Sequence, residues 1–213
     1  MKKSWLALGC LGVVVVVFLI ALTGVWGIYN NLVARSQEVD KQWAQVQNVY
    51  QRRADLIPNL VATVAGAANF EKSTLTEITT ARASVGQIKL DPNKAPDDPA
   101  RLAEFQKAQD HLSSALSRLL VVSERYPDLR ATGNFRDLQA QLEGTENRVT
   151  VERQKFNEAV QRYDTSVKSF PTVLLAGLFH FQSKPYFVAQ EGAETTPKVE
   201  FNFDSQKPAP AKP

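Results

Sequence analysis

The feature of this chain that most limits its fold is the run of residues 5–28, which contains no charged side chain. Leu, Val, Ile and Ala dominate the run, and Lys2 and Lys3 precede it. As a helix, these 24 residues measure roughly 36 Å, whereas a bilayer core of about 30 Å needs about 20 residues. Trp5 and Trp26 lie near the two ends, where aromatic rings favour the headgroup level. The sequence therefore predicts a retained transmembrane anchor over residues 1–30.

Two processed forms compete with a retained anchor. A cleaved signal peptide has an apolar core of about 7–15 residues and a small-residue cleavage site. This run is longer, and the polar residues that follow it, from Tyr29 on, offer no such site. A lipoprotein would be cut before Cys10, which is the only cysteine, but the apolar run continues well past it. Both forms remain alternatives, and the single cysteine excludes an intramolecular disulfide.

The charges on either side of the run predict its orientation. Lys2, Lys3 and the terminal amine precede it, whereas Arg35 and Lys41 follow it among acidic neighbours. The positive-inside rule then favours a cytoplasmic N-terminus and a body outside the cell membrane, in the periplasm or the extracellular space. Arg35 and Lys41 also raise the idea of lipid headgroup binding, which their acidic neighbours oppose. Without Lys2 and Lys3, 23 basic residues face 22 acidic ones, so a nucleic-acid partner is not expected.

Residues 32–170 are rich in Ala, Gln, Glu, Arg and Leu, and apolar residues recur there at alternating spacings of three and four. That spacing is typical of helices with one buried face. The longest example begins after Gly133 and Asn134 and ends at Pro171. It predicts coiled-coil-like packing through one seam, whose residues are Phe135, Leu138, Leu142, Thr145, Val149, Glu152, Phe156, Ala159, Tyr163, Ser166 and Phe170.

The preceding helix is expected from Pro99 to Tyr126. Proline suits a first helical turn, and Asp97 or Asp98 is the expected cap. The loop before it, residues 89–98, is rich in Pro, Asn and Asp and reads as a connection between helices.

Residues 31–88 are expected to form two helices. Pro58 lacks an N–H and crowds the carbonyl four residues back, so it should kink or break the first helix near Ala54. A second possible break lies near residues 66–70, and the position of the turn stays open. The fold class predicted is all-α, with a transmembrane helix that continues into an antiparallel up-and-down four-helix bundle over residues 31–188.

The C-terminal part differs from the helices before it. Residues 173–181 are apolar but too few to cross a membrane as a helix. This segment could pack on the bundle itself, on the membrane interface or on a partner. Apolar and polar residues alternate over residues 199–203, as they do in a short strand. The tail over residues 189–213 as a whole is expected to be extended or disordered.

Several short segments resemble the LemA family and occur in that family's order. They are YNNLV from Tyr29, RRADLIPNLV from Arg52, AR at Ala81, ERYPDL from Glu124, TENR from Thr145, FN at Phe156, Tyr163, FP at Phe170 and YF at Tyr186. The resemblance implies an anchored antiparallel helical bundle and no particular reaction. Family members often sit beside membrane-associated proteins and membrane proteases, which implies a binding or scaffold role. The Tyr and His usual near positions 67 and 69 are Ala67 and Asn69 here.

Charged residues on the predicted inner faces form the candidate site. Arg53 and Arg82 fall among apolar positions, where a guanidinium needs a carboxylate partner. Such pairs could fix the register of the helices, as polar seam positions do, or could form a ligand or partner site. Asp55 and Asn59 are expected to bond the backbone groups that Pro58 frees. The whole candidate cluster comprises Arg53, Asp55, Pro58, Asn59, Arg82, Glu124, Glu146, Asn147 and Glu152.

No catalytic, metal or cofactor motif accompanies this cluster. His111 and His180 lie outside any Glu-x-x-His motif, and Asp110 and His111 are expected on a solvated face. We therefore predict no enzyme, no metal and no cofactor. The leading hypothesis is a membrane-anchored interaction or scaffold module, which contacts the lipid bilayer through residues 5–28 and binds a protein partner or its own copies. The alternative is a ligand-binding or enzymatic domain that uses the Arg/Glu cluster.

Overall fold

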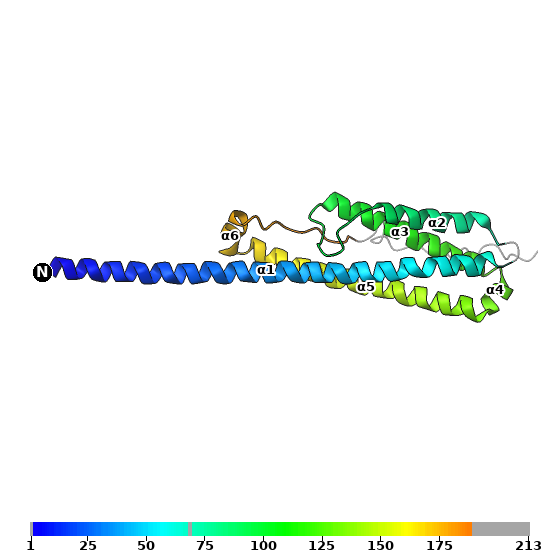
Figure 1. Ribbon diagram of the computed structural model, residues 1–213, viewed down its shortest axis with the longest axis horizontal. Coiled ribbons are helices and arrows are strands. Elements are labelled where there is room, and N and C mark those ends of the chain that lie inside the picture. The colour runs from blue at the N-terminus through cyan, green and yellow to red at the C-terminus, as the bar shows by residue number, and fades with distance from the viewer. Residues whose placement is uncertain (1, 68–69, 189–213) are drawn as a thin grey trace, which may run out of the picture.

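The computed structural model describes residues 2–67 and 70–188, with side chains from residue 11 on. The predicted tail over residues 189–213, including the alternating segment at 199–203, lies outside the described residues. Within the described ranges the regular elements are helices only, which confirms the all-α class. Figure 1 shows an elongated molecule in which a bundle surrounds one end of a much longer helix.

The long helix is α1, which runs without interruption from Lys2 to Ala65. Its 64 residues span about 96 Å. Its first part is long and apolar enough to cross a membrane, judged by length and composition, and the side chains there point into open space, with Phe18 61% exposed. From Leu32 onward the same helix buries one face in the bundle. The expectation that the anchor continues into the bundle without a linker is therefore confirmed.

Three further helices complete the bundle: α2 (Lys72–Gln87), α3 (Pro99–Ser123) and α5 (Gly133–Lys168). They alternate in direction with the bundle half of α1, as Figure 1 shows. α1 packs mainly against α5, and α2 packs mainly against α3. The turn whose position the sequence left open lies between Ala65 and Lys72.

Local capping explains where the helices begin. The Asp98 carboxylate accepts a hydrogen bond from the Ala100 N–H at 2.8 Å, so Asp98 rather than Asp97 caps α3. α3 ends three residues before the predicted Tyr126, and an unpredicted short helix, α4 (Pro127–Ala131), follows it. The Thr132 hydroxyl then caps α5.

Pro58 does not break α1, so the expected interruption near Ala54 is wrong. Proline removes one N–H, which leaves the Ala54 carbonyl without its intrahelical donor. Arg82 Nε of α2 donates to that carbonyl at 3.2 Å. The guanidinium thereby satisfies the carbonyl from outside the helix, and α1 continues for seven residues beyond the proline.

The predicted seam of α5 holds for most of the helix and fails at its end. Phe135, Phe156 and Tyr163 are buried, but Phe170 lies beyond the helix and is 82% exposed. Near the C-terminus the buried positions move to Val160, Asp164 and Val167. An α-helix drifts by about 20° per heptad from a strict 3.5-residue repeat, so a long straight helix changes its buried stripe.

A last short helix, α6 (Thr172–Leu178), follows α5. It lies beside α1 at the end of the bundle that faces the N-terminus (Figure 1). Residues 182–188 then run back along the bundle, and we call them the C-terminal strap. The strap answers one open question, because Phe187 is buried against the bundle's own core.

We predict that Arg82→Met lowers the free energy of unfolding by about 1 kcal/mol, because the Ala54 carbonyl loses a charged donor. In a Pro58→Ala background the loss should be smaller, since residue 58 regains the N–H that bonds this carbonyl. Thermal unfolding of the four full-length proteins in one detergent, followed by circular dichroism, measures the coupling. Equal losses in both backgrounds would contradict this role of Arg82.

Candidate functional site

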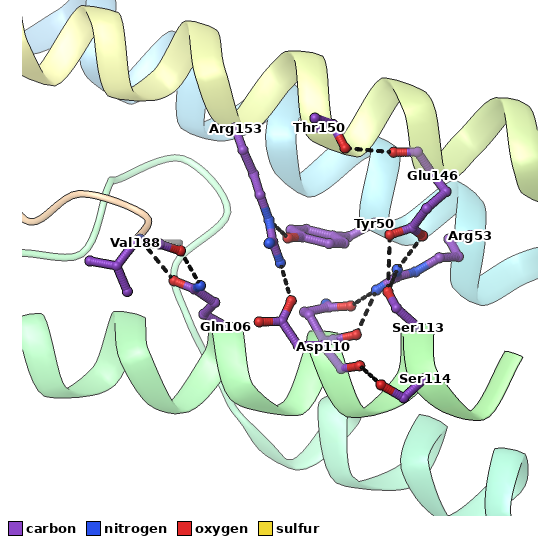
Figure 2. A network of polar contacts seen from close by, with 11 residues as sticks. Tyr50, Arg53, Gln106, Asp110, Ser113, Ser114, Glu146, Thr150, Arg153 and Val188 are labelled. Carbon is purple, nitrogen blue, oxygen red and sulfur yellow. Dashed lines mark hydrogen bonds and ion pairs between the residues drawn. The ribbon is translucent and has the colours of Figure 1, made fainter. Parts of the chain in front are cut away.

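A polar layer crosses the bundle between two apolar clusters. The cluster nearer the anchor includes Trp43 and Phe105, whereas the distal one includes Ile57 and Leu112. Between them, α1, α3 and α5 all place polar side chains at the same level, as Figure 2 shows. The layer comprises Tyr50, Arg53, Gln109, Asp110, Ser113, Glu146 and Arg153.

Arg53 is the centre of the layer and is only 1% exposed. Its Nη1 donates to Glu146 at 2.8 Å and to the Ser113 hydroxyl at 2.7 Å. Its Nη2 donates to the side-chain oxygen of Gln109 and, at 3.4 Å, to the Gln109 carbonyl. The guanidinium also lies over the Tyr50 ring, 5.2 Å from its centroid. One α1 side chain thus joins α3 and α5.

Arg153 makes a second connection in the same layer, from α5. Its Nη2 forms an ion pair with Asp110 of α3 at 2.9 Å, and its Nε donates to the Tyr50 hydroxyl of α1 at 2.5 Å. Both partners of the ion pair are about one-fifth exposed, so the pair is only partly screened by solvent. Arg153 also lies over the Phe187 ring at 5.1 Å, which connects the layer to the strap.

The pKa values of two groups in this layer, Tyr50 and Arg153, are shifted away from neutral pH. Burial raises the pKa of Tyr50, although Arg153 works in the opposite direction. Burial also opposes the charge of Arg153, but Tyr50 and Asp110 outweigh it and leave the pKa of Arg153 above its ordinary value. A general acid or base works best with a pKa near the operating pH. Both shifts move away from that range.

The structure brings together some of the predicted site residues. Arg53 meets Glu146 of the three expected carboxylates, at 2.8 Å. Arg82 is exposed rather than buried, and its backbone acceptor on α1 replaces the expected carboxylate. Glu152 pairs with Lys155 on its own helix at 2.8 Å. Glu124 is exposed at the end of α3, about 16 Å along the helix from Ser113.

The remaining predicted residues lie on the surface. Asp55, Pro58, Asn59 and Asn147 are all exposed. Asp55 accepts from the Gln51 amide at 2.7 Å, and the Asn59 carbonyl accepts from a threonine hydroxyl. The expected bonds from Asp55 and Asn59 to the groups freed by Pro58 are therefore replaced by the Arg82 contact.

Sequence reasoning missed Asp110 and Arg153. Asp110 was expected on a solvated face beside His111, yet its side chain is only 19% exposed. Asp110 follows the buried Gln109, and Arg153 follows the seam residue Glu152. Each therefore lies one position beyond the buried face of its helix, at the edge of the apolar stripe. Such flanking positions are where charges on neighbouring helices meet. Opposite charges at positions beside the apolar stripes of two neighbouring helices are the sequence signal that indicates this pair.

Lys184 anchors the strap nearer the membrane end of the bundle. Its side chain is 5% exposed, and its Nζ lies 3.1 Å from Asp97 and 3.6 Å from Asp40. Its backbone N–H donates to Asp164 at 3.1 Å. Partial burial opposes the charge of Asp97, but hydrogen bonds from Lys94 and Lys184 hold its pKa below the ordinary value. Lys184 thus joins the strap to three parts of the chain, two through its buried ammonium group and the third through its backbone N–H.

Two side-chain amides hold the rest of the strap in the way a neighbouring strand would. Asn157 of α5 donates to the Phe187 carbonyl and accepts from its N–H, both at 2.9 Å. Gln106 of α3 donates to the Val188 carbonyl at 2.6 Å and accepts from its N–H at 3.2 Å. The Phe187 ring stacks on Trp43 with 6.2 Å between centroids. The strap is therefore an integral part of the bundle.

The polar layer reaches solvent at its edges, where Glu146 is 47% exposed and Arg153 lines a hollow of about 500 Å³ beside the strap. A hollow of about 750 Å³ lies between α2 and α3, and another of about 690 Å³ lies beside α4, but neither is lined by Arg53 or Glu146. No group of three or more potential metal-binding side chains occurs in the part of the chain that the structure describes. The geometry supports a structural contact between three helices better than it supports a reaction centre.

Comparison with known proteins agrees with the fold. The family model described as LemA family matches residues 42–201. Magnetosome protein MamQ 2 of Paramagnetospirillum magneticum is 23% identical over 186 residues, which cover 78% of this chain and 67% of that protein. MamQ of Magnetospirillum gryphiswaldense is 23% identical, with 80% and 70% covered. Protein LemA of Metamycoplasma hominis is 22% identical, with 78% and 71% covered.

We predict that Arg53→Met destabilises the full-length protein by about 3 kcal/mol, because Gln109 loses its charged partner inside the bundle. Glu146→Gln should lower stability by only about 1 kcal/mol, since the amide oxygen still accepts from Arg53 and the side chain is half exposed. Thermal unfolding of both variants in detergent measures the difference. An effect of Glu146→Gln as large as that of Arg53→Met would contradict this division of roles.

Stability should also fall at alkaline pH through Tyr163, which is 2% exposed. Burial, aided by the charges of Asp164, Asp97 and Asp40, raises its pKa from 10.0 to about 12. Between those two pH values the folded state holds a proton that the unfolded chain has released, so the free energy of unfolding decreases as pH rises. Melting temperatures across this window should fall less steeply for Tyr163→Phe. Identical slopes for the two proteins would contradict this assignment.

Proposed function

This chain belongs to the LemA family, and from that premise we propose that it is a membrane-anchored interaction or scaffold module of the cell envelope. The observation that carries the proposal is the continuity of α1, which passes from an apolar span into the bundle as one helix. Residues 29–65 of that helix extend about 55 Å. A body held in this way presents its helices at a defined distance from the bilayer.

The proposal divides the chain into an anchor over residues 1–30, a bundle domain over residues 31–188 and a tail over residues 189–213. The basic residues before the span support a cytoplasmic N-terminus and a bundle on the outer side of the cell membrane. The relatives include proteins named for the magnetosome and a protein named LemA, and none of these names specifies a reaction. We therefore propose a binding role and no enzymatic one.

Within this proposal the cluster around Arg53 serves to fix helix register. A buried guanidinium is costly without its partners, so sliding α1 by one turn against α3 or α5 would break several bonds at once. The direct partner surface would then be the exposed faces of the bundle. Val121 of α3 and Val151 of α5 are 68% and 47% exposed, which makes them suitable positions for mapping those faces.

The test is crosslinking in the cell with a photoreactive amino acid at position 121 or 151 of the full-length protein, followed by purification in mild detergent. We expect a discrete crosslinked product, either with one membrane-associated protein or with a second copy, and the same species at fixed stoichiometry without crosslinking. The matched control fuses residues 1–30 to an unrelated soluble protein that carries the same photoreactive amino acid on its surface. This control should lack the product, because the proposed contact requires the bundle.

A full-length protein that is recovered alone and monomeric would contradict the scaffold proposal. The second candidate, a ligand-binding site in the polar layer, would then be tested by thermal shift against small anions. One observation favours that candidate, because the Arg53 Nε is buried without a hydrogen-bond partner. A ligand of this site should raise the melting temperature of the wild type and leave Arg53→Met unchanged.

A further inference from the structure

The apolar surface of α6 lacks cover from the rest of the described chain. Phe170 is 82% exposed, and Leu174 and Leu178 are each 68% exposed. Leu174 and Leu178 are four residues apart, so they lie on the same side of the helix. Ala176 is 2% exposed and packs into the membrane-proximal core cluster. α6 thus has one face against the bundle and an opposite apolar face that is open.

The position of α6 identifies what covers that face. The Phe179 ring, next after α6, contacts Tyr29 edge-on at 5.1 Å between centroids, and Phe181 contacts the same ring at 5.9 Å. Tyr29 directly follows the uncharged run of the anchor. α6 therefore lies at the level where α1 leaves the apolar part of its span, beside α1 in Figure 1.

A hollow between α1 and Phe179, the residue that follows α6, extends this contact into the span itself. It has a volume of about 370 Å³ and is lined by Phe179 together with Leu22, Val25, Trp26, Tyr29 and Asn30. From Leu22 to the end of the run at Ile28 the helix rises about 9 Å. Phe179 thus borders the outermost turns of the membrane-spanning run, where acyl chains meet headgroups.

The composition of the segment agrees with this location. Residues 169–183 contain no Lys, Arg, Asp or Glu. Apolar segments of this length are too short to span a bilayer and occur in buried core helices or in interfacial elements. The open face of α6 favours the second. A helix that lies in the interface buries its apolar face about 5–10 Å into the boundary between headgroups and acyl chains.

The turn that follows α6 directs the chain from the membrane end of the molecule back toward the bundle. His180 follows α6 with a positive φ of 60°. The Phe181 N–H bonds the Ala176 carbonyl at 2.9 Å, and the His180 N–H bonds the Gly177 carbonyl at 3.4 Å. These two bonds are the pair found in a Schellman motif, which closes a helix and reverses the chain. The strap begins immediately afterwards.

From these observations we propose that α6 and its flanking phenylalanines form a second membrane contact, a wedge that inserts into the bilayer interface beside the anchor. The occupant of the open face is lipid. A single spanning helix leaves rotation about its own axis free, whereas a second contact to one side fixes which face of the bundle points along the membrane. This inference rests on α1 spanning the membrane, as the proposed function also does.

The test measures depth in the bilayer with a fluorescent probe on a single cysteine. In a Cys10→Ala background, the variants Leu174→Cys and Leu178→Cys carry an environment-sensitive probe in full-length protein. Vesicles of phosphatidylcholine and phosphatidylglycerol contain lipids with a nitroxide just below the headgroups. Val121→Cys is the matched control, because Val121 is also 68% exposed but lies at the far end of α3. Val16→Cys, at the middle of the span, reports on the anchor in matched vesicles whose lipids carry the nitroxide deep in the acyl chain. Circular dichroism checks the fold of each labelled protein.

We expect the nitroxide lipids to lower the fluorescence at positions 174 and 178 by about twofold, as an interfacial depth requires, and to leave position 121 unchanged. Quenching at position 16 without quenching at 174 and 178 would overturn the wedge and leave the anchor intact. Loss of quenching at position 16 as well would overturn both. A blue-shifted signal at 174 that lipid does not quench and that disappears at low protein density would identify a second copy as the cover, which also overturns the proposal.

Discussion

The burial of Arg53 is the interaction on which the bundle depends. A guanidinium that is 1% exposed must keep its partners, and these partners come from two other helices, through Glu146 and Gln109. The apolar clusters above and below this layer contact through surfaces that could slide, because hydrophobic packing has little directional preference. In the role proposed for it, the charged layer removes that freedom. A polar position in an otherwise apolar seam specifies register in coiled coils by the same means.

In the proposed role of Arg53, the register that it sets extends to both ends of the molecule through α1. This helix carries the polar layer, the contact with Arg82 at Ala54 and the aromatic contact with α6. Because its span and bundle parts are one helix, fixing the bundle against α1 also fixes it against the bilayer. A wedge at α6 would restrain rotation of α1 about its own axis, which a single spanning helix leaves free.

Side chains from distant parts of the sequence bond backbone groups that the irregular segments of the chain would leave unpaired. Pro58 frees a carbonyl in α1, and a side chain of α2 satisfies it. The strap has no strand beside it, and Gln106 and Asn157 satisfy its backbone at Val188 and Phe187. Unpaired backbone groups in partly buried places are costly, so these contacts are requirements of the fold. They also explain how a segment with no regular structure can be buried in a helical bundle.

The sequence by itself determined the all-α class, the continuity of anchor and bundle, and a cap for α3 at Asp97 or Asp98, because each depends on local spacing and local bonds. It also indicated that Arg53 needs a carboxylate. Only the tertiary structure decided that Glu146 is that carboxylate, that Arg153 and Asp110 join the layer, and that Arg82 bonds a backbone carbonyl. It also decided that the strap lies on the bundle while α6 stays uncovered. The physical reason is that these contacts join residues far apart in the sequence, 28 positions for Arg82 and Ala54 and 93 for Arg53 and Glu146. Whether such residues meet depends on helix register and drift rather than on local pattern.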